Sequence, residues 1–157
     1  METIERVAPN ELLTIEREPV RTSETLRAYF DLTKPRITLM VVLTTIAGFC
    51  LASAQGIDWL KFLHLVIGVG LLSSGISTIN QWMERDLDAL MLRTKDRPLP
   101  AGRLTAMQAI VFGATLTLGS LVYLILFINA LTALLGVITA ASYLLLYTPL
   151  KTKTTLS

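Results

Sequence analysis

Asn80, Glu84 and Asp88 are the residues of this chain whose types and spacing best suit chemistry. They are spaced i, i+4 and i+8, so in a helix they would share one face, each about 6 Å from the next along the axis. Two carboxylates on one face repel each other unless a cation lies between them. Hard divalent cations prefer oxygen ligands, so these three residues are candidate Mg²⁺ ligands and candidate catalytic residues.

Basic residues follow this acidic stretch at once, namely Arg93, Lys95, Arg97 and Arg103. Mg²⁺ in proteins is commonly shared between one or two carboxylates and substrate phosphates. Arginine can bind a phosphate through two parallel hydrogen bonds. The segment therefore has the groups needed to hold a metal diphosphate. Spacing alone leaves two alternatives open, because a charge cluster between membrane spans can also be a solvated loop or part of an ion pathway.

Long apolar runs lie on both sides of this segment. The chain of 157 residues is 52% hydrophobic and 17% charged, a balance that departs from that of a soluble globular domain. No Asp, Glu, Lys or Arg occurs from Leu104 to Leu150. As helix this run would extend roughly 70 Å, whereas a bilayer core is about 30 Å thick, so the run must cross twice.

Two earlier runs have the same apolar character. We therefore predict an all-α, polytopic transmembrane helix bundle, with spans at about residues 37–54, 62–79, 106–126 and 130–146 and a charged loop over residues 80–105. Span two ends in small polar residues from Ser73 to Asn80, which lets helices approach closely and favours packing inside the bundle. If this helix continues past Trp82, the face that carries Glu84 and Asp88 extends beyond the span.

The positions of Lys and Arg predict the orientation of the bundle. Basic residues precede the first span, fill the charged loop and follow the fourth span, whereas the other two connections hold only Lys61. Positive loop residues resist translocation. The N-terminus, the charged loop and the C-terminus are therefore expected on the cytoplasmic side. The net charge of +2 gives no reason to expect a nucleic-acid partner.

Residues 1–28 differ from the rest of the chain. They contain Glu and Arg in quantity, together with Pro9 and Pro19, and no apolar stretch long enough for a signal peptide. We expect a mobile cytoplasmic tail over residues 1–28 and a separate membrane domain over residues 29–157.

Longer motifs support a family resemblance. The stretches Asn80–Asp88, Met91–Thr94 and Arg97–Arg103 resemble the first aspartate-rich motif of the intramembrane prenyltransferases of the UbiA superfamily. Tyr29–Arg36 before the first span and Tyr147–Lys151 after the fourth are similar to segments of the same family. Within the superfamily the chain most resembles the protohaem IX farnesyltransferase, or haem O synthase, branch, which also matches the Glu found here where other branches often have Asp.

This resemblance implies a membrane enzyme of about nine spans that uses Mg²⁺ to bind farnesyl diphosphate. It implies transfer of the farnesyl group to a vinyl group of haem B, which gives haem O. The diphosphate contacts would be Arg93, Arg97, Lys34 and Lys151. The resemblance also implies that the protein lies in the lipid of the cytoplasmic membrane of a bacterium. Haem A synthase or a terminal oxidase would be its assembly partner.

The family's second aspartate-rich motif has no counterpart in these 157 residues. We therefore expect the chain to correspond to the N-terminal half of the family's bundle and to be inactive alone. Three alternatives stay open: another UbiA-type prenyltransferase with an aromatic acceptor, a non-catalytic membrane helper, and a half-transporter subunit. An ion pathway should place charges within the spans, which counts against transport.

Overall fold

The chain folds into a bundle of long helices. The computed structural model describes residues 22–53 and 56–153, and within these ranges it contains helices and no strand. Four of the described helical segments are long and apolar enough to cross a membrane: Pro35–Ala52, Trp59–Leu90, Ala106–Phe127 and Ala130–Lys151. This confirms the predicted all-α, polytopic membrane architecture with four spans in this chain.

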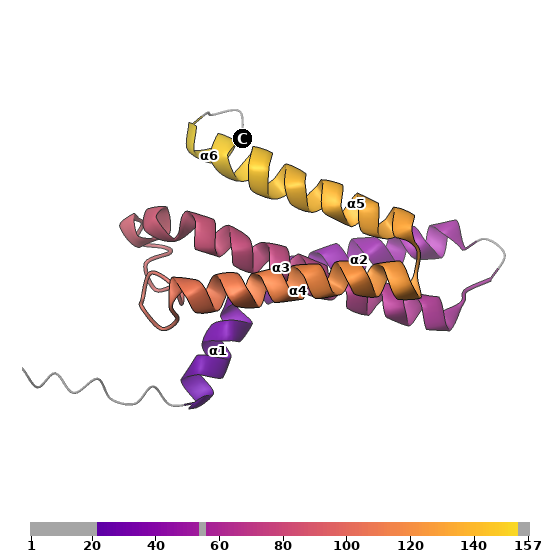
Figure 1. Cartoon of the computed structure of the whole chain (residues 1–157), viewed down its shortest axis with the longest axis horizontal. Helices are drawn as coiled ribbons and strands as arrows, with labels where there is room; N and C mark the ends of the chain where they lie inside the picture. Colours follow the sequence, from indigo (N-terminus) through magenta and orange to yellow (C-terminus); the bar gives the residue numbers. More distant parts are fainter. Residues whose placement is uncertain (1–21, 54–55, 154–157) are drawn as a thin grey trace, which may run out of the picture.

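The helices follow one another with short connections. In chain order they are α1 (Thr22–Leu32), α2 (Pro35–Ala52), α3 (Trp59–Leu90), α4 (Ala106–Phe127), α5 (Ala130–Ala141), a π-helical segment η1 (Ser142–Tyr147) and α6 (Thr148–Lys153). The connection of α3 with α4 and helix α6 lie toward one end of the bundle (Figure 1). The junction of α1 with α2 adjoins that connection, since Lys34 and Pro35 line one pocket with Arg93 and Arg97. We call this end of the bundle the charged end, because it gathers the segments that the sequence predicts to lie on one side of the membrane.

Helix α1 overlaps the tail predicted over residues 1–28. Its residues 22–28 are helical, and Ala28 and Leu32 are fully buried in a small core with Leu104 and Ala109. The predicted boundary at residue 28 is therefore too late, since local acidic composition did not reveal this tertiary contact. The rest of that predicted tail, residues 1–21, lies outside the described residues.

Helix α3 is the central element of the bundle and continues well past the predicted span. Asp58 caps its N-terminus by accepting hydrogen bonds from the backbone N–H groups of Leu60 and Lys61, each at 3.1 Å. The helix then runs without interruption to Leu90. The expected continuation past Trp82 is thus confirmed.

Glycines bring α3 and α4 close together. A Cβ atom added at Gly75 would lie 2.5 Å from Thr117 Oγ1, 2.7 Å from the backbone nitrogen of Thr117 and 3.0 Å from the carbonyl oxygen of Gly113. Only hydrogen at this position allows such an approach of two helix backbones. The small residues at the end of span two are therefore packed inside the bundle, as the sequence indicates.

The fourth span changes its helical geometry near the charged end. Residues Ser142–Tyr147 form a π-helical segment between α5 and α6. Pro149 has no backbone N–H to donate. The carbonyl oxygen of Tyr143 accepts both the backbone N–H of Thr148, five residues on, and, at 2.9 Å, the Thr148 hydroxyl. The wider π-helical turn rotates the end of the fourth span about its axis, so that Thr148 and Lys151 face α3.

A glycine substitution tests the close approach of α3 and α4. The Gly75→Ala variant should lose about 1–3 kcal/mol of stability, because its Cβ meets backbone atoms that cannot move aside. Gly119→Ala on α4 is the matched control, since a Cβ there meets nothing within 4 Å. Thermal unfolding in detergent micelles measures both. Equal melting temperatures for the two variants would contradict the proposed packing.

Candidate anion and metal site at the charged end

The extended part of α3 buries the three polar residues singled out by the sequence. Asn80 is 1% exposed, Glu84 6% and Asp88 5%, although this part of the helix lies beyond the predicted span. Arg85 and Asp86, on the other side of the helix, pair with each other at 3.3 Å and are much more exposed. The predicted division of α3 into two faces is therefore present, and the polar face points into the protein.

Asn80 is held by two residues from distant parts of the chain. Its side-chain oxygen accepts a hydrogen bond from Lys34 Nζ at 2.7 Å, and its side-chain nitrogen donates to Thr148 Oγ1 at 3.1 Å. Because Thr148 in turn donates to the carbonyl oxygen of Tyr143, the amide has one defined orientation. Its oxygen faces the Lys34 side of the site.

The two carboxylates are each neutralised by a different cation. Lys151 Nζ, from α6, lies 3.2 Å from Glu84 Oε1, and Arg97 Nη1, from the loop after α3, lies 2.6 Å from Asp88 Oδ2. A buried carboxylate without such a partner would be strongly destabilising. The structure therefore brings three of the four predicted diphosphate contacts, Lys34, Arg97 and Lys151, against the predicted metal ligands.

The loop after α3 folds back because its polar groups bond to the end of that helix. Thr94 is buried, and its hydroxyl donates to the carbonyl oxygen of Asp88 at 2.8 Å. The N–H of Arg97 bonds the carbonyl oxygen of Thr94 at 3.0 Å. Gly102, with a φ of 68°, allows the chain to turn before α4. These contacts direct the Arg97 side chain toward Asp88.

Lys34 occupies an unusual backbone position that α3 stabilises. It has a φ of 48° and a ψ of 64°, in the left-handed region, and Pro35 begins α2 directly after it. Gln81 Nε2 donates to the carbonyl oxygen of Leu32 at 2.9 Å, which fixes the end of α1. The pKa of Lys34 is lowered from 10.5 to about 8, mainly by burial and then by the positive charge of Arg97. The negative charge of Glu84 offsets part of this shift, because it raises the pKa of Lys34.

A basic pocket of about 540 Å³ lies beside these residues. Arg93, the fourth predicted diphosphate contact, lines this pocket together with Lys34 and Arg97. Two further arginines also line it, Arg36 and Arg103. Arg103 is partly engaged, because it donates to the carbonyl oxygen of Asp96 at 2.6 Å and lies 3.7 Å from an Asp31 carboxylate oxygen. The pocket has the charge and the donors to bind an anion.

Sequence reasoning assigned no site role to Arg36, Gln81 or Thr148. Arg36 was noted only as a basic residue before the first span and as the end of the family-like stretch Tyr29–Arg36, and its position two residues after Lys34 could have marked it as a pocket residue. Thr148 lies within the Tyr147–Lys151 stretch that resembles the family, but its hydrogen bond to Asn80 joins residues 68 positions apart. Such a contact has no signature in local spacing.

An apolar pocket of about 380 Å³ continues from the charged end into the bundle. It lies between α2, α3, α4, α5 and η1, and Ile37 lines both this pocket and the basic pocket. Ser73, Ser77 and Tyr143 provide polar groups in its wall, and most of the remaining lining is aliphatic. A ligand with an anionic head and an apolar tail would match this pair of neighbouring pockets.

The donor set suits a metal ion that arrives with a phosphate ligand. Among the residues that the structure describes, no three His, Cys, Asp or Glu side chains gather as a metal site. Glu84 and Asp88 supply two carboxylates and Asn80 an amide oxygen, all on one buried helix face. Mg²⁺ commonly takes one or two carboxylates and completes its shell with waters and phosphate oxygens, so these residues fit that mode of binding.

The fold and the site together define a polytopic helical membrane protein with an anion-binding pocket beside a buried acidic helix face. The chain belongs to the UbiA prenyltransferase family, whose pattern it matches over residues 41–157. It is 45% identical to a protoheme IX farnesyltransferase of Solibacter usitatus, over 82% of this chain and 47% of the relative. Identity is 39% to protoheme IX farnesyltransferase 2 of Pseudoalteromonas atlantica, over 78% of this chain and 40% of that protein.

A protoheme IX farnesyltransferase of Opitutus terrae is 41% identical, over 78% of this chain and 41% of the relative. The chain thus spans about half the length of the curated relatives it matches. No solved structure was found to match it. The resemblance to the UbiA family and its protohaem IX farnesyltransferase branch is therefore confirmed by independent comparison.

The lowered pKa of Lys34 makes a prediction about stability and pH. Between pH 8 and 10.5 the unfolded chain binds more protons at this residue than the folded chain does, so folded-state stability rises with pH in that window. The free energy of unfolding of the wild type, relative to Lys34→Met, should rise there by a few kcal/mol at most.

Chemical unfolding in micelles at several pH values measures this difference. Lys95→Met is the matched control, because Lys95 is exposed in the same charged end, and its profile should follow that of the wild type. A difference between wild type and Lys34→Met that stays constant from pH 8 to 10.5 would contradict the assignment.

Proposed function

We propose that this chain supplies part of the active site of an enzyme that transfers the farnesyl group of farnesyl diphosphate to a vinyl group of haem B, which gives haem O, and that the chain is inactive alone. One observation carries the proposal: cations from three separate segments converge on an acidic face of α3, beside an apolar pocket. The choice of donor and acceptor is supported by the names of the relatives, which are protoheme IX farnesyltransferases.

The diphosphate is proposed to bind in the basic pocket. Lys34, Arg93 and Arg97 line it, and Lys151 contacts Glu84 in the middle of the acidic face. Arginine can hold two phosphate oxygens at once, whereas lysine supplies a compact charge. Lys34 and Lys151 are therefore suited to stabilise the negative charge that develops on the departing diphosphate. Arg93 and Arg97 are suited to orient the diphosphate.

Mg²⁺ is the proposed cofactor, and Asn80, Glu84 and Asp88 are its proposed protein ligands, directly or through water. When bound, it supplies positive charge that stabilises the departing diphosphate. With Mg²⁺ bound, Lys151 and Arg97 would no longer be needed to neutralise Glu84 and Asp88, because the two positive charges of the ion balance both carboxylates. These two side chains could then contact the diphosphate without leaving a buried carboxylate unpaired.

The reaction proposed is an electrophilic prenyl transfer. The bond between C1 of the farnesyl group and the diphosphate oxygen breaks, and its electron pair leaves with the diphosphate. The vinyl group of haem B donates its π electrons to the allylic cation, which forms the new carbon–carbon bond. Water then adds to the resulting cation and loses a proton, so the product carries a hydroxyethylfarnesyl group. Preorganised cations at the leaving group lower the barrier to the first step.

The apolar pocket is proposed to hold the farnesyl chain. Its aliphatic lining from Leu65, Val69 and Leu72 of α3 and Leu135 of α5 offers no nucleophile to an allylic cation. Excluding water from this region protects the cation until the acceptor reacts. Ile37 lines both the basic pocket and the apolar pocket, so C1 of the farnesyl group is proposed to lie near it.

The cellular setting follows from the same proposal. We place the protein in the cytoplasmic membrane of a bacterium, with the charged end facing the cytoplasm, because Lys and Arg are concentrated at that end. Haem A synthase or a terminal oxidase is the proposed assembly partner, since haem O formed in the membrane must pass to a protein that uses it.

Conservative substitutions on α3 test the proposed site. Glu84→Gln and Asp88→Asn should each weaken Mg²⁺-dependent binding of farnesyl diphosphate at least about tenfold, the effect of losing roughly 1.4 kcal/mol. Asp86→Asn is the matched control, because Asp86 lies between them on the exposed side of the same helix, and it should bind as the wild type does. Binding of isotopically labelled farnesyl diphosphate to the chain in nanodiscs, with and without Mg²⁺, measures the effect.

Two results would count against the proposal. Unchanged binding in both Glu84→Gln and Asp88→Asn would remove these residues from the site. Equal binding with Mg²⁺ and with the chelator EDTA would remove the metal. The acceptor is tested separately, in a full-length relative that carries the same site residues. If this relative prenylates a labelled aromatic acceptor in competition with haem B, the assignment of haem B as the acceptor would be wrong, but the diphosphate site would stand.

A further inference from the structure

The apolar pocket between the helices ends in a layer of side chains at the far end of the bundle. The far end is the end opposite the charged end, where α2 and α4 stop and α3 and α5 begin (Figure 1). Each of these four helices contributes one pocket residue nearest to that end: Thr45 of α2, Leu65 of α3, Leu124 of α4 and Thr132 of α5. We call these four residues the floor of the pocket.

Aromatic contacts lie beyond the floor and join the helices that form it. Phe49 of α2 and Phe62 of α3 have ring centroids 5.6 Å apart, and His64 of α3 stacks on Phe127 of α4 at 4.5 Å. None of these four residues lines the apolar pocket. Leu124 itself is only 1% exposed, because it packs in the hydrophobic core. The far end of the pocket is therefore closed by side chains of the chain itself.

Two contacts fix the register of α2 against α3. The hydroxyl oxygens of Thr38 and Ser73 lie 3.4 Å apart near the charged end, and Phe49 contacts Phe62 near the far end. Both helices advance by eleven residues between these contacts, so they run antiparallel in a constant register. In this register Leu65 lies level with Thr45 to within one residue.

The depth of the pocket matches the length of a farnesyl chain. C1 of the farnesyl group is proposed to lie near Ile37, and α2 advances eight residues from Ile37 to Thr45, which is roughly 12 Å of helix. The main chain of a farnesyl group spans about 13 Å, at roughly 1.2 Å per bond as in an extended polypeptide backbone. One more isoprene unit would add about 5 Å, so a longer chain would meet the floor.

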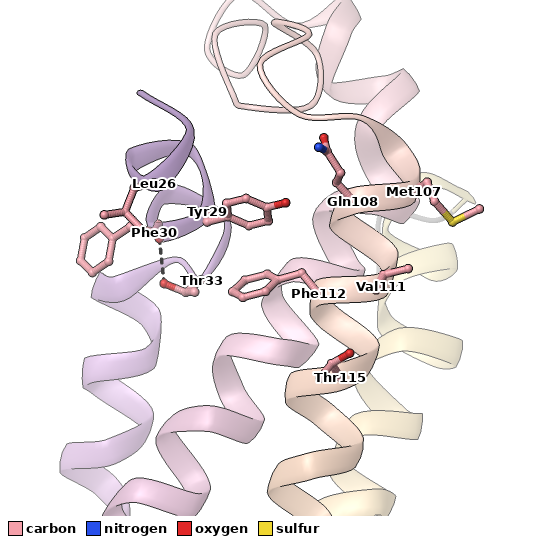
Figure 2. Close-up of a pocket in the computed structure, with 9 residues that line it drawn as sticks. All are labelled: Leu26, Tyr29, Phe30, Thr33, Met107, Gln108, Val111, Phe112 and Thr115. Carbon is pink, nitrogen blue, oxygen red and sulfur yellow. Dashed lines mark hydrogen bonds between the residues drawn. The ribbon is translucent and has the colours of Figure 1, made fainter. Parts of the chain in front are cut away.

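A second apolar groove, between α1 and α4, does not extend this pocket. Figure 2 shows Phe30 of α1 and Val111 of α4 among the residues that line the groove. It shares no lining residue with the apolar pocket, and Thr115, its last residue on α4, lies nine residues before Leu124. A chain in the apolar pocket therefore has no continuation into this groove.

We infer that the floor limits the length of the prenyl chain, and that Leu65 is a residue that determines the specificity for a farnesyl group. This inference rests on the proposed function, which places the diphosphate in the basic pocket and its chain in the apolar pocket. The floor suits an apolar chain end, because the Thr45 hydroxyl already donates to the carbonyl oxygen of Val41 at 2.8 Å. A longer chain would have to displace Leu65 or leave its end outside the pocket, whereas a shorter chain would leave apolar surface unfilled.

Binding of prenyl diphosphates of three lengths tests this inference. The dissociation constants of geranyl, farnesyl and geranylgeranyl diphosphate are measured on the chain in nanodiscs with Mg²⁺, and their ratios are compared, so that effects on the diphosphate site cancel. The wild type should bind farnesyl diphosphate at least about tenfold more tightly than geranylgeranyl diphosphate. Leu65→Ala deepens the pocket and should bind geranylgeranyl diphosphate about tenfold more tightly than the wild type does.

Val69→Phe tests the same inference in the opposite direction. Val69 lines the pocket one helical turn nearer to the charged end than Leu65, so a larger side chain there should weaken the binding of farnesyl diphosphate about tenfold relative to geranyl diphosphate. Retained binding of geranyl diphosphate would show that this variant is folded. Ile67→Ala is the matched control, because Ile67 is 41% exposed on the same helix and lines none of the three pockets.

Equal affinity of the wild type for farnesyl and geranylgeranyl diphosphate would overturn the inference, because the chain end would then lie outside the pocket. Affinity ratios that stay at their wild-type values in both Leu65→Ala and Val69→Phe would also overturn it. Absence of Mg²⁺-dependent binding for all three diphosphates would contradict the proposed function itself, and the inference with it, so the two failures are distinguishable.

Discussion

The charged end of this protein depends on the neutralisation of one helix face. Glu84 and Asp88 lie one helical turn apart and are almost fully buried, so their mutual repulsion cannot be relieved by water. Lys151 and Arg97 neutralise them from α6 and from the loop after α3. Lys34 reaches the same face from the junction of α1 and α2. Segments far apart in the sequence are therefore held together by one acidic surface.

This arrangement also explains why the site can receive an anion. A metal ion bound to the acids would free two cations that are already in position, so little reorganisation is needed before they contact a diphosphate. The lowered pKa of Lys34 reflects its burial first and the nearby positive charge of Arg97 second. The close packing of α3 on α4 through Gly75 supports the arrangement, because it holds rigid the helix from which the acids project.

Much of this organisation could be predicted from the sequence, and the limits are physical. Apolar runs set the four spans, and the i, i+4, i+8 spacing placed Asn80, Glu84 and Asp88 on one face because helix periodicity is a local property. The partners of these residues were predicted as diphosphate contacts, but their pairing with the acids was not, since it depends on how the loop and α6 return to α3. Local composition likewise gave no sign of the burial of Ala28 in α1, or of the role of Thr148 in orienting Asn80. The roles of the site residues in catalysis stay predictions.

The most direct test of this account replaces Mg²⁺ with Mn²⁺ and observes the metal by electron–nuclear double resonance. The chain, with ¹³C-labelled Asp and Glu carboxylates, is mixed with Mn²⁺ and farnesyl diphosphate. The account predicts ³¹P coupling from the diphosphate together with ¹³C coupling from carboxylates, and loss of the ¹³C coupling when Glu84 and Asp88 are both changed to their amides. Phosphorus coupling without any carboxylate coupling in the wild type would contradict it, because the metal would then be held by the diphosphate alone and not by the acidic face of α3.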